Sequence, residues 1–225
     1  MTECQLRKDM KDNKKLLIQG FIAFALTTLM SVKAQDDLYP RVLIETTAGS
    51  MTVELNPARA PLTVKNFLEY ADNGFYEGTI FHRVVASFVI QGGGYTTDFK
   101  LKTTRPNIPN ESGNGLKNLR GTIAMARAGD PHSADSQFFI NLANTDRLDP
   151  MPTRWGYAVF GEIVEGMDVV DDIGYRTTGP AGPFSSNVPA VPVIIEKISL
   201  LSAAKANDHP FYLRPAPLPS TTSGY

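Results

Sequence analysis

The segment 81–94 of this 225-residue chain sets an arginine and a glutamine among strand-forming apolar residues and ends in three consecutive glycines. Such residues favour extended backbone and the glycines interrupt it, so the pattern predicts a strand, a turn and a second strand over 81–91. A guanidinium on an apolar strand is costly to bury without a partner. Because no Asp or Glu lies between Glu77 and Asp98, we treat Arg83 and Gln91 as candidate functional residues.

Several other segments alternate apolar and polar residues or form short apolar runs, as short strands do. We expect further strands at 41–46, 51–55, 121–126, 137–142, 157–163 and 193–201. Two helices are expected, one opening at Pro61 and ending at Gly74, and one over 166–173. Residues 96–119 predict a long surface loop. About eight strands and two helices indicate a mainly β domain, and composition alone leaves a barrel and a sandwich open.

Composition excludes several classes of function. The chain is 42% hydrophobic and 20% charged, as in a soluble globular protein, and its length fits one domain with extensions. A formal net charge of -1 gives no electrostatic basis for a nucleic-acid partner. The single cysteine, Cys4, excludes a disulfide within one chain and a cysteine-based metal site. Three scattered histidines do not indicate a metal site either, so we expect no metal.

The leader, residues 1–34, has the pattern of a secretory signal peptide. Three lysines precede an apolar run at 16–32, and small residues stand at Val32 and Ala34, the positions that a signal peptidase reads. This predicts cleavage between Ala34 and Gln35 and a periplasmic or secreted location.

An uncleaved membrane anchor is the alternative for this leader. Its apolar run of about 17 residues, interrupted by polar ones, is marginal for spanning roughly 30 Å of hydrocarbon. Met10 is an alternative start that would shorten the charged region before the run. At the other end, the four prolines of 203–225 predict a poorly ordered tail, which leaves 35–202 as one domain.

Four ordered blocks resemble the signature of the cyclophilin family of peptidyl-prolyl cis/trans isomerases, especially its bacterial branch with periplasmic members. The blocks are 81–94, 121–127, 136–141 and 157–161. The resemblance spans about 41 to 201. It implies a closed eight-stranded antiparallel β-barrel capped by two α-helices. It also implies a monomeric enzyme without cofactor, whose substrates are unfolded or extended proline-containing polypeptides, here exported proteins.

The resemblance assigns catalysis to Arg83 and Gln91. A prolyl bond rotates over roughly 18–20 kcal/mol because the nitrogen lone pair is delocalised into the carbonyl. A donor at the imide nitrogen favours the localised lone pair of the twisted transition state, and a 10⁴-fold acceleration requires roughly 5.5 kcal/mol. Arg83 would be this donor, while Gln91 would hold Arg83 and contact substrate backbone. Without the resemblance, Arg83 could equally be a surface residue paired with a distant carboxylate.

The resemblance also assigns substrate contacts. Four apolar side chains would form the walls of a proline pocket, although each alone is better explained as core. Two further residues would bind the extended substrate through their backbone, a glutamine would line the neighbouring subsite, and a histidine would support the rim. The predicted substrate-binding residues are His82, Phe88, Val89, Ala126, Arg127, Gln137, Phe139, Leu148 and Tyr157.

Other functions were weighed against this one. In a hydrolase, His82 would act as base for Ser136 or Ser87, but adjacent strand residues face opposite sides and no G-x-S-x-G motif is present. The principal rival is a proline-directed binding or chaperone module without catalysis. A third alternative is a structural envelope protein attached through the leader or the tail.

Four places depart from the family pattern. Ala86-Ser87 replaces the Pro-Gly of the turn between the site strands, and since Ser adopts positive φ poorly, another turn type or slight strain is expected. Val89 replaces a Met, which gives a shallower and stiffer pocket wall, and Tyr157 replaces a His. Arg147 replaces a rim aromatic, which puts binding of cyclosporin-like cyclic peptides in doubt without affecting isomerisation.

Overall fold

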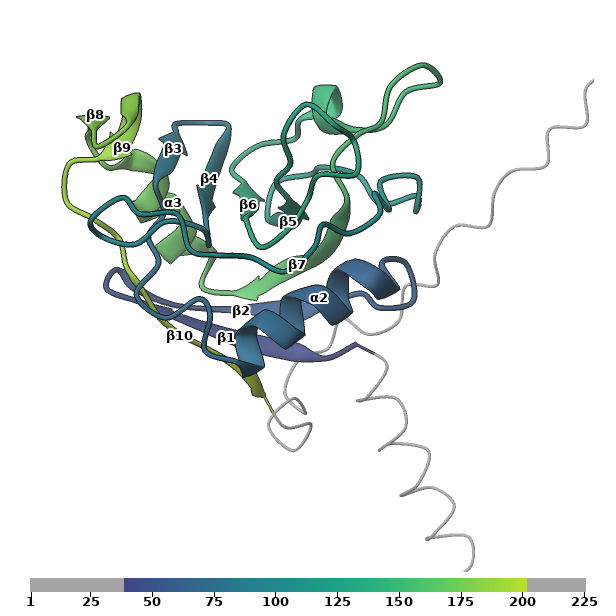
Figure 1. The fold of residues 1–225 in the computed structure, drawn as a ribbon, viewed down its shortest axis with the longest axis horizontal. Helices are drawn as coiled ribbons and strands as arrows, with labels where there is room; N and C mark the ends of the chain where they lie inside the picture. The colour runs from purple at the N-terminus through teal and green to yellow at the C-terminus, as the bar shows by residue number, and fades with distance from the viewer. Residues whose placement is uncertain (1–38, 202–225) are drawn as a thin grey trace, which may run out of the picture.

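A computed structural model describes residues 39–201, so the predicted signal peptide, its cleavage point and the tail from 203 lie outside the described residues. Eight strands form one antiparallel sheet in the order β10-β1-β2-β7-β5-β6-β4-β3. They are β1 (Arg41–Thr46), β2 (Gly49–Leu55), β3 (Arg83–Val85), β4 (Val89–Gly92), β5 (Thr122–Met125), β6 (Phe138–Asn141), β7 (Val159–Glu165) and β10 (Ile195–Leu201). Figure 1 shows this sheet curling around the interior. All eight predicted strands are present.

The curled sheet is closed only along a short stretch, where residues 78–81 meet residues 193–195. Its two edge strands, β3 and β10, do not form a ladder, but the segments just before them meet at an antiparallel bridge between Ile80 and Ile194. Next to this bridge, the N–H of Phe81 donates to the carbonyl of Val193 at 3.0 Å. Beyond it, β3 packs against another strand, β9 (Phe184–Pro189), instead of β10. The predicted eight-stranded antiparallel barrel is therefore confirmed, with partial closure of its seam.

Two α-helices accompany the sheet, as predicted. Helix α2 (Pro61–Asp72) begins with proline in its first turn, where the missing N–H costs nothing, and packs against β10. Helix α3 (Met167–Tyr175) packs against β2, β3 and β4 (Figure 1). Neither these helices nor any other part of residues 39–201 provides a helix long and apolar enough to cross a membrane.

The main core lies between the sheet and the helices. Strand β1 shows the reason, because its buried residues alternate strictly with half-exposed ones. In the centre, the ring of Phe67 from α2 lies 5.3 Å from Tyr76, 5.6 Å from Phe138 and 5.2 Å from Phe160, centroid to centroid. Tilted and edge-on aromatic contacts of this kind add stability beyond the buried area.

A second, two-stranded sheet was missed by the sequence analysis. It pairs β8 (Thr178–Ala181) with β9, and β9 packs against β3, as Figure 1 shows beside the labels of the three strands. The segment 176–192 is rich in Gly, Pro and Ser, a composition that indicates loop. The pairing is irregular, with a register shift between Gly179 and Ala181.

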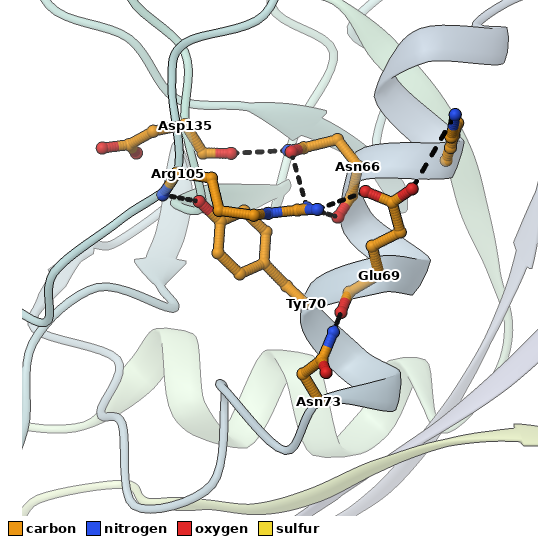
Figure 2. A network of polar contacts seen from close by, with 7 residues as sticks. Asn66, Glu69, Tyr70, Asn73, Arg105 and Asp135 are labelled. Carbon is orange, nitrogen blue, oxygen red and sulfur yellow. Dashed lines mark hydrogen bonds and ion pairs between the residues drawn. The ribbon is translucent and has the colours of Figure 1, made fainter.

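The long loop at 96–119 is held against α2 by a polar network centred on Arg105 (Figure 2). The Arg105 backbone N–H donates to the Tyr70 hydroxyl at 2.8 Å, and its guanidinium lies over the Tyr70 ring and pairs with Glu69. The same guanidinium donates to the backbone and side-chain oxygens of Asn66, both at 3.1 Å. Asn66 in turn donates to the carbonyl of Asp135 at 2.6 Å. Helix α2 thus fixes both the loop and the segment that leads into β6.

Candidate active site

A row of three polar side chains runs from β3 across β4 to the residue just before β6. Arg83 and Gln91 are direct partners in the β3–β4 ladder, and Arg83 Nη1 donates to Gln91 Oε1 at 3.3 Å. Gln91 Nε2 donates onward to Gln137 Oε1 at 3.2 Å. These two hydrogen bonds orient both glutamine amides. The Arg83 guanidinium is therefore held by a neutral amide oxygen and not by a carboxylate.

Arg83 keeps its charge uncompensated. Its side chain is half-buried, and within residues 39–201 it forms no ion pair with a carboxylate. Its guanidinium carbon lies 5.8 Å from the centre of the Phe88 ring. A half-desolvated cation with donors to spare is suited to a neutral ligand that accepts hydrogen bonds.

An apolar cluster separate from the main core lies next to this row; we call it the second apolar cluster. Its buried members are Val89, Ala124, Ala126, Phe139 and Val159, and its partly buried members are Phe88, Leu116, Leu148 and Tyr157. Six of these nine residues are among the predicted substrate-binding residues. The partly buried members leave apolar surface above the buried ones, and an apolar ring could cover this surface.

Three members of the second apolar cluster were not predicted. Ala124 stands two residues before Ala126 on β5, so the period of two along a strand could have indicated it. Val159 lies in a strand that was predicted, but nothing local separates it from core valines. Leu116 comes from the long loop, where no periodicity exists.

Arg127 forms the edge of the cluster beside Tyr157. The Arg127 guanidinium carbon lies 4.6 Å from the centre of the Tyr157 ring, which makes an edge-on contact with Phe139 at 5.5 Å. The Arg127 side chain also donates to the carbonyls of Trp155 and Gly156 at 3.0 and 3.3 Å. The role predicted for Arg127 was a backbone contact, and the structure gives its side chain a separate task in holding the 155–157 segment.

His82 is placed differently from the other predicted site residues. It is 3% exposed, and its ring packs against Tyr95 and Phe184, which also contact each other, away from the second apolar cluster. Burial lowers the pKa of His82 to about 4, opposed by a backbone hydrogen bond with Ile80 and reinforced by the charge of Arg83. The imidazole is therefore neutral near neutral pH and lies beneath the strand that carries Arg83.

The serines of the hydrolase alternative do not meet this histidine. Ser87 is exposed in the β3–β4 turn, whereas Ser136 is fully buried and its hydroxyl has no partner among the described residues. His82 Nδ1 likewise has no hydrogen-bond partner within residues 39–201. A nucleophile needs its base within hydrogen-bond reach, and this arrangement provides no such pair. Among residues 39–201, no three His, Cys, Asp or Glu side chains could together hold a metal ion.

Two departures from the family pattern have visible consequences. Ser87 adopts φ 57°, and the N–H of Phe88 donates to the carbonyl of Val85 at 3.0 Å across the turn. Positive φ at only the third turn position defines a type II turn, in which a non-glycine residue is strained. Arg147, on a short 3-10 helix (Asp146–Leu148), places its guanidinium carbon 4.1 Å from the centre of the Phe88 ring.

Comparison with known proteins matches this chain to one enzyme family and to bacterial relatives of that family. Residues 41–200 match the sequence model of the family described as cyclophilin type peptidyl-prolyl cis-trans isomerase/CLD. The chain is 45% identical over 185 residues to peptidyl-prolyl cis-trans isomerase A of Dickeya dadantii (strain 3937), which covers 80% of this chain and 97% of the relative. It is 49% identical over 162 residues to peptidyl-prolyl cis-trans isomerase B of Escherichia coli (strain K12), covering 71% and 98%.

A solved structure shares the fold. It is a cyclophilin type peptidyl-prolyl cis-trans isomerase of Cryptosporidium parvum, crystallised in the presence of the dipeptide Ala-Pro. Its TM-score is 0.59 at 28% sequence identity, and the match covers 72% of this chain and 99% of that one.

Proposed function

The chain belongs to the cyclophilin-type peptidyl-prolyl cis-trans isomerases, and from this premise we propose that Arg83 accelerates X-Pro rotation by donating to the imide nitrogen while the second apolar cluster receives the proline ring. The observation that carries the proposal is the position of the Arg83 guanidinium, which contacts Gln91 and lies beside Phe88. The substrates of such an enzyme are proline-containing peptides.

The chemistry follows from what changes during rotation. In the planar ground state the imide nitrogen is a poor acceptor, because its lone pair is delocalised; in the twisted state the lone pair is localised and accepts a hydrogen bond. A donor fixed there binds the transition state better than either isomer, which is the condition for catalysis. Charge-assisted hydrogen bonds in a partly dry site are of the required strength. No covalent bond is made or broken.

The two glutamines position the donor. Gln91 receives one N–H of Arg83, and its own amide is oriented by Gln137, so the guanidinium is held before substrate arrives. Such preorganisation spares the site the cost of ordering a long side chain during the reaction. The predicted contact of Gln91 with substrate backbone is compatible with this role.

The test is isomerisation of an Ala-Pro test peptide, followed by NMR exchange. Arg83→Ala is expected to lose about 10²-fold or more in kcat/KM while still binding peptide weakly. Arg176→Ala is a matched control, because Arg176 pairs with Asp172 on the exposed end of α3. Full activity of Arg83→Ala would refute the donor role, and an inactive wild type that binds peptide would favour the binding or chaperone module.

We propose further that the enzyme acts on exported proteins, after removal of its leader. The support is the signal-peptide pattern of residues 1–34 with its expected cut between Ala34 and Gln35. N-terminal sequencing of protein from cell fractions tests it. Mature protein beginning at Gln35 in the periplasm or medium is the expected result, and an intact leader in the membrane fraction would support the anchored alternative.

A further inference from the structure

The arginines of residues 39–201 divide by whether they form salt bridges. Four lie away from the site and pair with carboxylates: Arg41 with Glu54, Arg105 with Glu69, Arg120 with Asp171 and Arg176 with Asp172. Four others lie around the site and pair with no carboxylate of the described residues: Arg83, Arg127, Arg147 and Arg154. Arg59 also lacks a salt bridge and donates to the carbonyl of Asn114. On a chain of net charge -1, this concentrates uncompensated positive charge at the site.

Arg147 differs from the other arginines of the site. Arg83 donates to Gln91, and Arg127 and Arg154 donate to backbone carbonyls. The Arg147 side chain is exposed, and its guanidinium contacts the Phe88 ring without a hydrogen bond or ion pair to any of residues 39–201. All its N–H donors therefore remain available to a ligand.

The two carboxylates nearest Arg147 in the sequence form no salt bridge with it. Asp149 Oδ1 accepts the backbone N–H of Asn118 at 2.7 Å and its Nδ2 at 3.0 Å, which fixes that carboxylate elsewhere. Asp146 is exposed and forms no salt bridge within the described residues. Neither carboxylate therefore occupies the Arg147 guanidinium, and the nearby Arg154 donates to the Arg147 backbone carbonyl at 2.7 Å.

The ring of Phe88 contacts the guanidinium groups of both Arg147 and the proposed catalytic residue Arg83. The same ring has the Arg147 guanidinium at 4.1 Å and the Arg83 guanidinium at 5.8 Å, and it packs on the second apolar cluster. Stacking on an aromatic face holds a guanidinium in place and leaves its edge free to bind a carboxylate through two hydrogen bonds. A residue next to a proline seated on the cluster would lie within reach of that edge.

We propose that Arg147 is a specificity-determining residue that selects acidic side chains next to the proline, so that the enzyme isomerises Glu/Asp-Pro or Pro-Glu/Asp segments faster than their amide counterparts. The inference rests on the proposed seating of proline on the second apolar cluster. It gives Arg147, the residue that replaces the rim aromatic, a role in substrate selection.

The test compares peptides that differ only in charge. Acetylated, amidated peptides carry Glu or Gln directly before the proline, or directly after it, and kcat/KM is measured by NMR exchange. For wild type we expect a Glu/Gln ratio of about three to five at one or both positions at low ionic strength, falling toward one in about 0.5 M salt. Arg147→Met should bring the ratio to about one, and Arg147→Glu should favour a Lys peptide. Lys197→Met, which removes an exposed charge on β10, should keep the wild-type ratio.

The outcomes separate this inference from the proposed function. A wild type that turns over the Gln peptides but shows a ratio of one at both positions overturns the role of Arg147 and leaves the isomerase intact. A ratio that survives in Arg147→Met also overturns it. A wild type inactive on every peptide refutes the proposed mechanism as well. Circular dichroism of each variant checks that a changed ratio does not come from unfolding.

Discussion

The ring of His82 lies stacked on the ring of Phe184, with centroids 5.3 Å apart and planes inclined by 29°. Tyr95 lies 4.7 Å from His82 and 5.0 Å from Phe184, so the three rings contact one another. Phe184 begins β9, so this contact is where the unpredicted hairpin fastens onto the segment that leads into β3. Protonation of His82 would put a charge into this aromatic site, next to Arg83, and would therefore oppose folding.

The first prediction concerns stability at low pH. The pKa of His82 is lowered to about 4 in the folded protein from 6.5, so the unfolded chain binds the proton more tightly. Its contribution to stability is complete above about pH 6.5 and is lost as the pH falls toward 4. Between about pH 7.5 and pH 5, His82 should lower the free energy of unfolding by about 2 kcal/mol. Urea denaturation of wild type and His82→Phe at both pH values measures it.

Carboxylates also titrate in this pH range and change the stability of both proteins. The difference between wild type and His82→Phe therefore isolates the contribution of His82. His82→Phe keeps an aromatic ring packed against Tyr95 and Phe184 but cannot be protonated. Its free energy of unfolding should fall less steeply with acidification than that of wild type. Parallel pH curves for the two proteins would show that His82 is not held neutral by the fold.

The second prediction concerns the strained turn between the site strands. Ser87 is exposed at φ 57°, a conformation that glycine adopts without the steric cost of a Cβ. Ser87→Gly should raise the free energy of unfolding by about 0.5–1 kcal/mol, since the strain exceeds the added flexibility of the unfolded chain. Thermal denaturation measures the shift. Ser50→Gly, on an exposed strand position, is the control and should be destabilising. A loss of stability in Ser87→Gly would contradict the assignment of strain.

The third prediction concerns the start of α2, which has no cap of its own. Its first residue follows Ala60, and the carboxylate of Glu111 from the long loop accepts the N–H groups of Leu62 and Thr63 at 3.1 and 2.8 Å. A carboxylate at a helix N-terminus satisfies free donors and complements the helix dipole. Glu111→Ala should therefore lower the free energy of unfolding by about 1–2 kcal/mol. Urea denaturation at neutral pH measures it, with Glu196→Ala on β10 as the control.

These examples show which parts of the fold were predictable. β1 could be predicted because burial alternates along it, β5 and β6 because they are short continuous apolar runs, and the helices because apolar spacing and Pro61 define them. The attachments of the long loop could not, since Glu111 and Arg105 reach partners 48 and 36 residues away. Tertiary hydrogen bonds and ion pairs at such separations leave no local pattern in the sequence. The β8–β9 hairpin was missed because its prolines and glycines indicate loop.

Some residues of the candidate site could be predicted from the sequence and others could not. Arg83 and Gln91 stood out because polar groups on an apolar strand require an explanation, and the ladder places them opposite each other. Val159 could not be separated from core residues, because a small apolar side chain has the same pattern in both places, whereas Ala124 could have been found from its spacing to Ala126. The position of His82 was not predictable either, since its partner Phe184 belongs to the missed hairpin. The catalytic roles of these residues stay predictions.

The last prediction concerns Gly94, the third glycine of the run that follows β4. A Cβ built there would lie 2.6 Å from Gln137 Cγ and 2.8 Å from its Cδ, so any side chain must displace Gln137. The backbone of Gly94 is not in the left-handed region, so alanine itself adds no backbone strain. The displaced amide could not keep its 3.2 Å contact with Gln91, which in turn orients Arg83.

Gly94→Ala should therefore act on catalysis more than on stability. We expect kcat/KM for an Ala-Pro peptide to fall on the order of tenfold, with the loss in kcat, because the donor is misplaced by a fraction of an ångström. The melting temperature should change by only a few degrees, about the effect of 1 kcal/mol. Gly113→Ala is the matched control, since its Cβ would meet nothing within 4 Å. Unchanged kcat in Gly94→Ala would mean that the Gln91–Gln137 contact does not position Arg83.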